Sequence, residues 1–162
     1  MHHRSLVLGI LAAAAVILAL GIAACGGSDG TEATSLQGTT LQGETVDLAL
    51  AGDKPTVVNF FASWCPPCNS EAADLVKFAE AHPEVQVVGV AVNDAQADTE
   101  RFVTQYRLPY TVLMDPDGEL AGVWGVDGIP ATFFLDKSGK QQASMVGAAS
   151  LEQFEEKLKS VQ

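Results

Sequence analysis

Two cysteines separated by two prolines are the residues of this chain best suited to chemistry. Cys65 and Cys68 lie in the stretch FFASWCPPCNSEAADL, between an apolar run and a segment with helical periodicity. Thiols at this spacing can form a redox pair, supply half of a metal site, or close a structural disulfide. The elements around the cysteines, and the other ligands within reach, decide among these uses.

The cysteines lie at a predicted strand-to-helix junction. Residues 56 to 62 (TVVNFFA) are β-branched and aromatic and have the length of a strand. Residues 66 to 81 place apolar side chains at helical spacing, and Pro83 follows as a stop signal. A helix that begins after Cys65 offers unpaired backbone N–H groups and the positive end of its dipole, which favour a thiolate.

Pro66 and Pro67 suit the first positions of that helix, because their missing N–H groups would have had no partner within it. They also stiffen the turn. Cys68 then lies one helical turn beyond Cys65, close enough for a disulfide with a small adjustment.

The other uses of the pair fit less well. A disulfide stabilises more as its loop lengthens, and this loop is very short. Zinc needs four ligands, yet beyond the pair the mature domain offers only His82 and carboxylates. A peroxide-reducing cysteine usually follows a Thr or Ser by three residues, a place that Ala62 occupies here. Copper(I) can be held by two thiolates alone, so a metallochaperone or another non-catalytic binding module stays open as an alternative.

The rest of the chain predicts an α/β domain without internal repeats. Strands alternate with helices, which predicts a largely parallel sheet with a closing hairpin. An N-terminal hairpin is expected around the Gly43-Glu44 turn, and the spacing of Ser150 and Gln153 fits a capping box at the last helix. Besides the junction, we expect strands at 85–92, 110–115, 131–136 and 141–146 and helices at 98–106 and 120–124.

The N-terminus predicts export. Residues 6 to 24 carry no polar side chain, and Ile22-Ala23-Ala24-Cys25 resembles a bacterial lipobox, in which the signal is cleaved before a cysteine that becomes lipid-modified. We therefore expect a signal peptide at 1–24, a lipidated Cys25 with a flexible tether at 25–37, and the folded domain at 38–162. An uncleaved membrane helix is the alternative, since 19 apolar residues span about 28 Å.

Length and charge restrict the partners. The chain has 162 residues, enough for a single domain of ordinary size. Its formal net charge is −11, so its surface would repel polyphosphate, and nucleic acid is not an expected partner.

A distant motif adds a family resemblance. Strand, WCPPC and helix are followed much later by Gly128-Ile129-Pro130-Ala131-Thr132-Phe133 at the start of a strand. From about residue 36 to the end, the chain resembles the thioredoxin superfamily, in particular its TlpA/ResA/DsbE-like membrane-tethered thiol-disulfide oxidoreductases. The resemblance implies a thioredoxin-like α/β fold: a central mixed sheet flanked by helices, with an N-terminal hairpin and an inserted helix-strand unit.

The resemblance also implies roles for residues around the pair. Pro130 is expected to be cis and to lie against the cysteines, which leaves the Ile129 backbone free to pair with a substrate peptide. Trp64 is expected to cover the pair and to shape the docking surface, with simple packing as the alternative. Trp124 is expected in the core.

One position departs from cytoplasmic thioredoxin. The buried aspartate six residues before the first active-site cysteine is replaced by Asn59, which cannot accept a proton. Glu71, one helical turn beyond Cys68, is the candidate proton acceptor, since ResA-like proteins carry an acid there. Burial would raise its pKa toward the range of a general base, whereas an exposed helix glutamate is the alternative.

The sequence therefore predicts thiol-disulfide exchange through Cys65 and Cys68 at the extracytoplasmic face of a bacterial membrane, without a cofactor or metal. Expected partners are exported proteins with thiols or disulfides, a redox partner in the membrane or envelope, and the membrane itself. By analogy with the branch we favour a reductant, for example in cytochrome c maturation. An oxidant in secreted-protein folding is the alternative.

Overall fold

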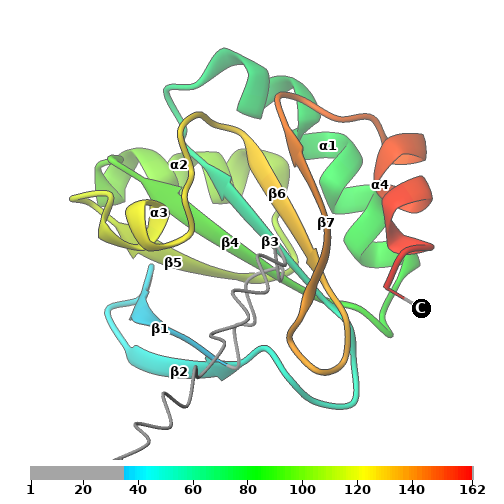
Figure 1. The fold of residues 1–162 in the computed structure, drawn as a ribbon. Helices are drawn as coiled ribbons and strands as arrows, with labels where there is room; N and C mark the ends of the chain where they lie inside the picture. Colours follow the sequence, from blue (N-terminus) through cyan, green and yellow to red (C-terminus); the bar gives the residue numbers. More distant parts are fainter. Residues whose placement is uncertain (1–34, 162) are drawn as a thin grey trace, which may run out of the picture.

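The computed structural model describes residues 35–161 (Figure 1). The expected signal peptide, the lipidated Cys25 and nearly all of the tether lie outside the described residues. Within 35–161, no helix is long and apolar enough to cross a membrane.

Strands and helices follow one another in an α/β order. They are β1 (Ser35–Thr40), β2 (Thr45–Ala49), β3 (Thr56–Phe61), α1 (Pro66–Ala81), β4 (Gln86–Val92), α2 (Gln96–Tyr106), β5 (Thr111–Asp115), α3 (Glu119–Val123), β6 (Ala131–Leu135), β7 (Gln141–Val146) and α4 (Leu151–Leu158). The segment β4-α2-β5-α3 fills the long interval between Cys68 and Pro130, as the inserted unit of the resemblance requires.

The seven strands form a mixed sheet in the order β2-β1-β5-β4-β3-β6-β7. The three central strands β3, β4 and β5 pair with one another in parallel. The hairpins β1-β2 and β6-β7 are antiparallel within themselves, and each also pairs antiparallel with this central group. The expectation of a largely parallel sheet from strand-helix alternation is therefore wrong. Each hairpin adds antiparallel pairings at one end of the sheet, so the mixed sheet implied by the resemblance is the one present.

The folded domain begins earlier than expected. Strand β1 starts at Ser35 inside the predicted tether, and Leu36 is only 2% exposed within the core. This segment contains a single large apolar residue among polar ones, so it has no periodicity to distinguish it from a linker. Pairing of Leu36 with Leu48 across the hairpin makes it a strand.

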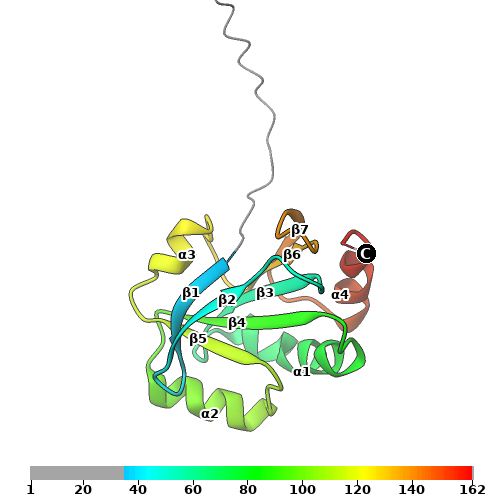
Figure 2. The same ribbon diagram turned by 90° about the horizontal axis from the view of Figure 1, so that it is seen from below.

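The two faces of the sheet are covered by different helices. Figure 2 shows α1 and α2 on one face and α3 on the other, and α4 packs against α1, with the Phe78 and Phe154 rings 5.7 Å apart. Along β3, Val58 and Phe60 belong to the core cluster on the α3 side, whereas Val57 packs toward α1 and α4. Strand alternation therefore turns Asn59 toward α1, the helix that carries the cysteines.

Two local signals from the sequence have their expected structures. Gly43 adopts a φ of +84° in the β1-β2 turn, a conformation that favours glycine. At the start of α4, the Ser150 backbone N–H donates to the Gln153 side chain at 2.9 Å, which forms half of the capping box. Trp124 packs against Phe60 and Phe133 beside the core.

Candidate active site

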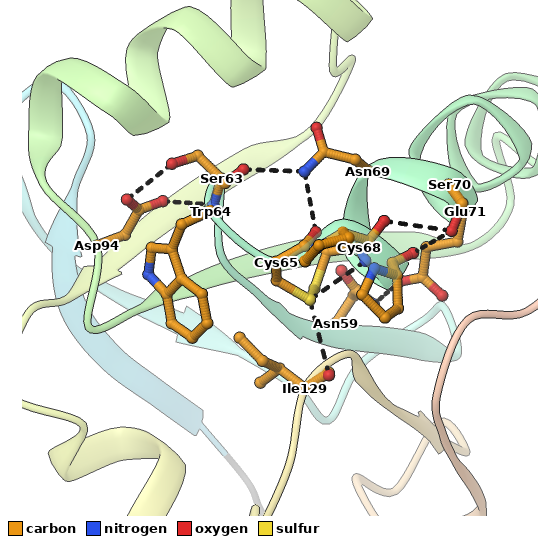
Figure 3. The surroundings of a disulfide bond; sticks show 12 residues. Asn59, Ser63, Trp64, Cys65, Cys68, Asn69, Ser70, Glu71, Asp94 and Ile129 are labelled. Atoms are coloured by element: carbon orange, nitrogen blue, oxygen red, sulfur yellow. Dashed lines mark hydrogen bonds between the residues drawn. A yellow bond between two sulfur atoms is a disulfide. The ribbon is translucent and has the colours of Figure 1, made fainter.

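A disulfide between Cys65 and Cys68 closes the first turn of α1, with the two Cα atoms 5.3 Å apart (Figure 3). Cys65 is the N-cap residue, and Pro66 and Pro67 occupy the next two positions. The Cys68 backbone N–H points at the Cys65 sulfur, with N and Sγ 3.2 Å apart. Both cysteines are buried. The helix terminus thus supplies one of its free donors to the sulfur that would carry the thiolate.

The loop before β6 lies against this disulfide. The Ile129–Pro130 peptide bond is cis, as the resemblance implies, and the Ile129 carbonyl oxygen is 3.7 Å from Cys65 Sγ. The Gly147 backbone N–H donates to the Pro130 carbonyl at 2.8 Å, which ties this loop to the end of β7. A residue distant in sequence therefore forms one wall of the site.

Trp64 is a large exposed side chain next to the pair. It is 60% exposed, and its indole N–H donates to the Asn93 carbonyl at 3.0 Å. A hollow of about 360 Å³ opens between this ring, Ile129 and helix α3. Asp117 and Asp127 also line it. Trp64, Ile129 and Pro130 thus come together around Cys65, and their role in substrate docking stays a prediction.

Glu71 lies on the other side of the disulfide from Trp64 (Figure 3) and is buried, with 2% of its surface exposed. Its Oε1 accepts a hydrogen bond from Asn59 Nδ2 at 2.9 Å, and its Oε2 accepts one from the Ala149 backbone N–H at 3.1 Å. Asn59 also donates to Thr132 Oγ1 on the neighbouring strand, at 2.9 Å. Glu71 and Asn59, predicted separately, are therefore bonded to each other.

Burial raises the pKa of Glu71 from 4.5 to about 7, while the hydrogen bonds from Asn59 and Ala149 act in the opposite direction. Removal from water outweighs these bonds, because a carboxylate inside the protein loses its hydration. A carboxyl group with a pKa near neutrality can accept and release a proton under ordinary conditions. Glu71 follows Cys68 by three residues on α1, and its role as a general base in exchange stays a prediction.

The described residues hold no group of three or more His, Cys, Asp or Glu placed to bind a metal. His82 is the C-cap of α1 and therefore lies about 24 Å from the cysteines along a helix of 16 residues. It pairs with Glu84 instead. Ala62, in the place of a peroxide-site hydroxyl, is fully buried.

Sequence reasoning missed a second group of polar residues around the Ser63–Cys65 turn. The Asn69 amide donates to the carbonyls of Ser63 and Cys65, and the Asp94 carboxylate accepts from Ser63. An asparagine directly after the second cysteine was the one local signal available. Asp94 lies in the loop after β4, and no spacing in the sequence connects it to the cysteines.

Comparison with known proteins agrees with this geometry. The profile of the AhpC/TSA family matches residues 30–144. The chain belongs to the AhpC/TSA family. This AhpC/TSA chain is 31% identical to the thiol-disulfide oxidoreductase ResA of Bacillus thuringiensis, over 82% of this chain and 78% of that protein. It is 37% identical to the soluble secreted antigen MPT53 of Mycobacterium bovis, over 81% and 77% of the two chains.

A solved structure shares the fold. A secreted disulfide oxidoreductase of Mycobacterium tuberculosis, homologous to DsbE of E. coli, superposes with a TM-score of 0.71 at 32% identity, covering 76% of this chain and 94% of that one. Within the AhpC/TSA family, this chain is a thiol-disulfide oxidoreductase with the thioredoxin-like fold.

Proposed function

We propose that this enzyme exchanges disulfides with exported proteins outside the cytoplasmic membrane and acts as a reductant of their disulfides. The observation that carries the proposal is the Cys65–Cys68 disulfide between the Ile129 carbonyl on one side and a buried acid, Glu71, on the other. On the first side, Ile129 lines the hollow beside Trp64, where a substrate peptide would dock, and Glu71 on the other side would accept a proton.

The cycle begins with the reduced enzyme. The Cys65 thiolate attacks a substrate disulfide, a mixed disulfide forms, and one substrate sulfur leaves as a thiolate. Glu71 takes the proton of Cys68, and the Cys68 thiolate attacks Cys65 Sγ. The second substrate sulfur leaves, so the substrate gains two electrons and the enzyme holds the Cys65–Cys68 disulfide. A redox partner in the membrane or envelope then returns two electrons.

The direction of electron flow is proposed from the donors around Cys65. Cys68 offers its N–H to the sulfur, whereas Pro66 and Pro67 have none to offer. An ionised Glu71 behind the pair would further disfavour a thiolate. Pairs become strong oxidants when their reduced form is stabilised, so weak stabilisation of the thiolate favours a reductant.

The location is proposed from the N-terminal sequence and from relatives described as secreted. The apolar run at residues 6 to 24 would direct export, and lipidated Cys25 would hold the domain at the membrane. Apocytochrome c is a candidate substrate among exported proteins with thiols.

A Cys68→Ser variant tests the exchange function. Expressed in the source organism, it should accumulate mixed disulfides through Cys65, because the thiol that resolves them is gone. The adducts should disappear on reduction, and their protein components identify the substrates. A variant with both cysteines changed to serine is the control. If Cys68→Ser traps no protein, and the wild type does not reduce insulin, the chain is a binding module and not an exchange enzyme.

Equilibration of the purified enzyme with glutathione buffers tests the direction. We expect a reduction potential near the thioredoxin end of the range, between about −230 and −270 mV. A potential near about −120 mV would instead identify an oxidant in secreted-protein folding.

A further inference from the structure

A hydrogen-bonded network that the exchange cycle does not use holds the turn in front of α1. Asn69 directly follows Cys68, and its Nδ2 donates to the carbonyl oxygens of Ser63 and Cys65, both at 2.9 Å (Figure 3). Its Oδ1 accepts from the Tyr106 hydroxyl at 3.1 Å. Every polar atom of this amide thus has a partner, and Tyr106 at the end of α2 fixes which way the amide faces.

The same turn is held from its other side. Asp94, which follows β4 and is nearly buried, accepts from the Ser63 backbone N–H at 2.7 Å and from the Ser63 hydroxyl at 2.8 Å. These charge-assisted bonds fix Ser63 on the sheet. Asn69 then ties that fixed turn to the helix that carries Cys68.

This arrangement has a consequence when the disulfide opens. The covalent link between Cys65 and Cys68 is then lost, and Cys65 becomes joined to a substrate. The hydrogen bonds donated by the Asn69 side-chain amide do not depend on the sulfur–sulfur bond. They therefore keep the Cys65 turn against the turn of α1 that carries Cys68. A held geometry of this kind raises the effective concentration of one reacting group at the other.

We propose that Asn69 is a positioning residue that sets the effective concentration of the Cys68 thiol at Cys65 Sγ. It thereby favours resolution of the mixed disulfide and formation of the Cys65–Cys68 bond. The proposal rests on exchange through this pair and assigns to Asn69 no proton transfer and no contact with substrate.

Equilibrium with glutathione measures this effective concentration directly. The reduced enzyme and one oxidised glutathione give the Cys65–Cys68 disulfide and two reduced glutathiones, so two electrons and two protons pass to glutathione. In Asn69→Ala, the equilibrium constant for this oxidation should fall about fivefold, equivalent to about 20 mV for the two-electron couple. The mixed disulfide of Cys65 with glutathione should also persist longer, since its resolution by Cys68 slows.

Two further variants distinguish positioning from general damage to the helix end. The Ser70 hydroxyl donates to the Pro67 carbonyl at 2.8 Å, a bond inside α1 that does not reach the Ser63–Cys65 turn. Ser70→Ala should therefore leave the equilibrium constant unchanged. Tyr106→Phe keeps both Asn69 donors but removes the bond that orients the amide, so it should shift the constant in the same direction by a smaller factor.

The proposal is overturned if Asn69→Ala keeps the wild-type equilibrium constant, or if Ser70→Ala lowers it equally. Should Asn69→Ala fail to fold, an unchanged constant in Tyr106→Phe overturns it as well. A wild-type enzyme that does not equilibrate with glutathione would refute the exchange function itself, which separates that failure from a failure of the Asn69 proposal.

Discussion

At the residue scale, Asn59 and Glu71 show that the buried acid of this site lies on α1 and not on the strand. The strand position that holds an acid in cytoplasmic thioredoxin here holds an amide, and the acid comes from α1. Asn59 donates to Glu71 and to Thr132 from the same Nδ2. The amide cannot accept a proton, but it holds the carboxyl group that can.

The pH dependence of exchange should therefore depend on Glu71. The wild-type rate of mixed-disulfide resolution should rise through about pH 7, because burial places the pKa of Glu71 there. Glu71→Gln should lose this rise and should resolve the mixed disulfide about 10²-fold more slowly above neutrality. Stopped-flow measurement of mixed-disulfide resolution between about pH 5.5 and about pH 9, a range that brackets a general base near neutrality, gives both the pH profile and the rate ratio of the two proteins. An unchanged profile would exclude proton transfer by Glu71.

The Glu71→Gln variant is a fair test because its partners can still be satisfied. If the Asn59 amide turns over, its oxygen can accept from the introduced side-chain amide and from the Thr132 hydroxyl, while the introduced amide oxygen accepts from the Ala149 N–H. The variant therefore removes the titrating group and keeps an acceptor for the Ala149 N–H and for the Thr132 hydroxyl.

Stability of the oxidised protein checks the same pKa without catalysis. The folded-state pKa of Glu71 lies above its ordinary value, so the native state binds more protons than the unfolded state between about pH 4.5 and 7. The stability that protonated Glu71 contributes is consequently lost as pH rises through this window, by about 3 kcal/mol at most. Denaturant unfolding at about pH 5 and at about pH 8 should show that Glu71→Gln gains stability relative to the wild type at the higher pH.

At the scale of the elements, local signals predicted what local physics determines. The strand-to-helix junction, the proline start of α1 and the position of Glu71 one turn beyond Cys68 depend on spacing within one segment, and they have the predicted structures. The cis bond before Pro130 followed from resemblance, since spacing alone does not place that loop against the cysteines.

What the sequence could not predict is contact between distant segments. Strand direction was predicted wrongly because a strand's own residues do not reveal whether its neighbour runs parallel, and two hairpins made most pairings antiparallel. Leu36 became part of a strand only through its partner strand. The hydrogen bonds of Asp94, Tyr106 and Ala149 likewise involve three other segments of the chain, whose positions are set by packing of the whole domain.

At the scale of the whole molecule, charge is the property that acts on a substrate before contact. The formal net charge is −11, and the chain from Leu108 to Asp136 contains no Lys or Arg. This segment includes Asp117 and Asp127, which line the hollow beside Trp64. The hollow beside Trp64 and Ile129 is therefore negatively charged, and a cationic partner that approaches through it should reach Cys65 faster than an anionic one.

Reduction of small charged disulfides tests this expectation. At low ionic strength the reduced enzyme should reduce cystamine, a dication, about tenfold faster than a dianionic disulfide acid. Each rate is first divided by the rate at which a neutral dithiol reagent reduces the same disulfide, which corrects for intrinsic reactivity. The ratio should fall as salt is added, because the Debye length shortens to about 10 Å at 0.1 M.

Asp127→Asn should lower the ratio more than Asp53→Asn, which removes the same charge near the opposite end of β3. Equal effects of the two variants would assign the preference to net charge alone. A ratio of the two normalised rates that stays constant as salt is added would exclude electrostatic steering.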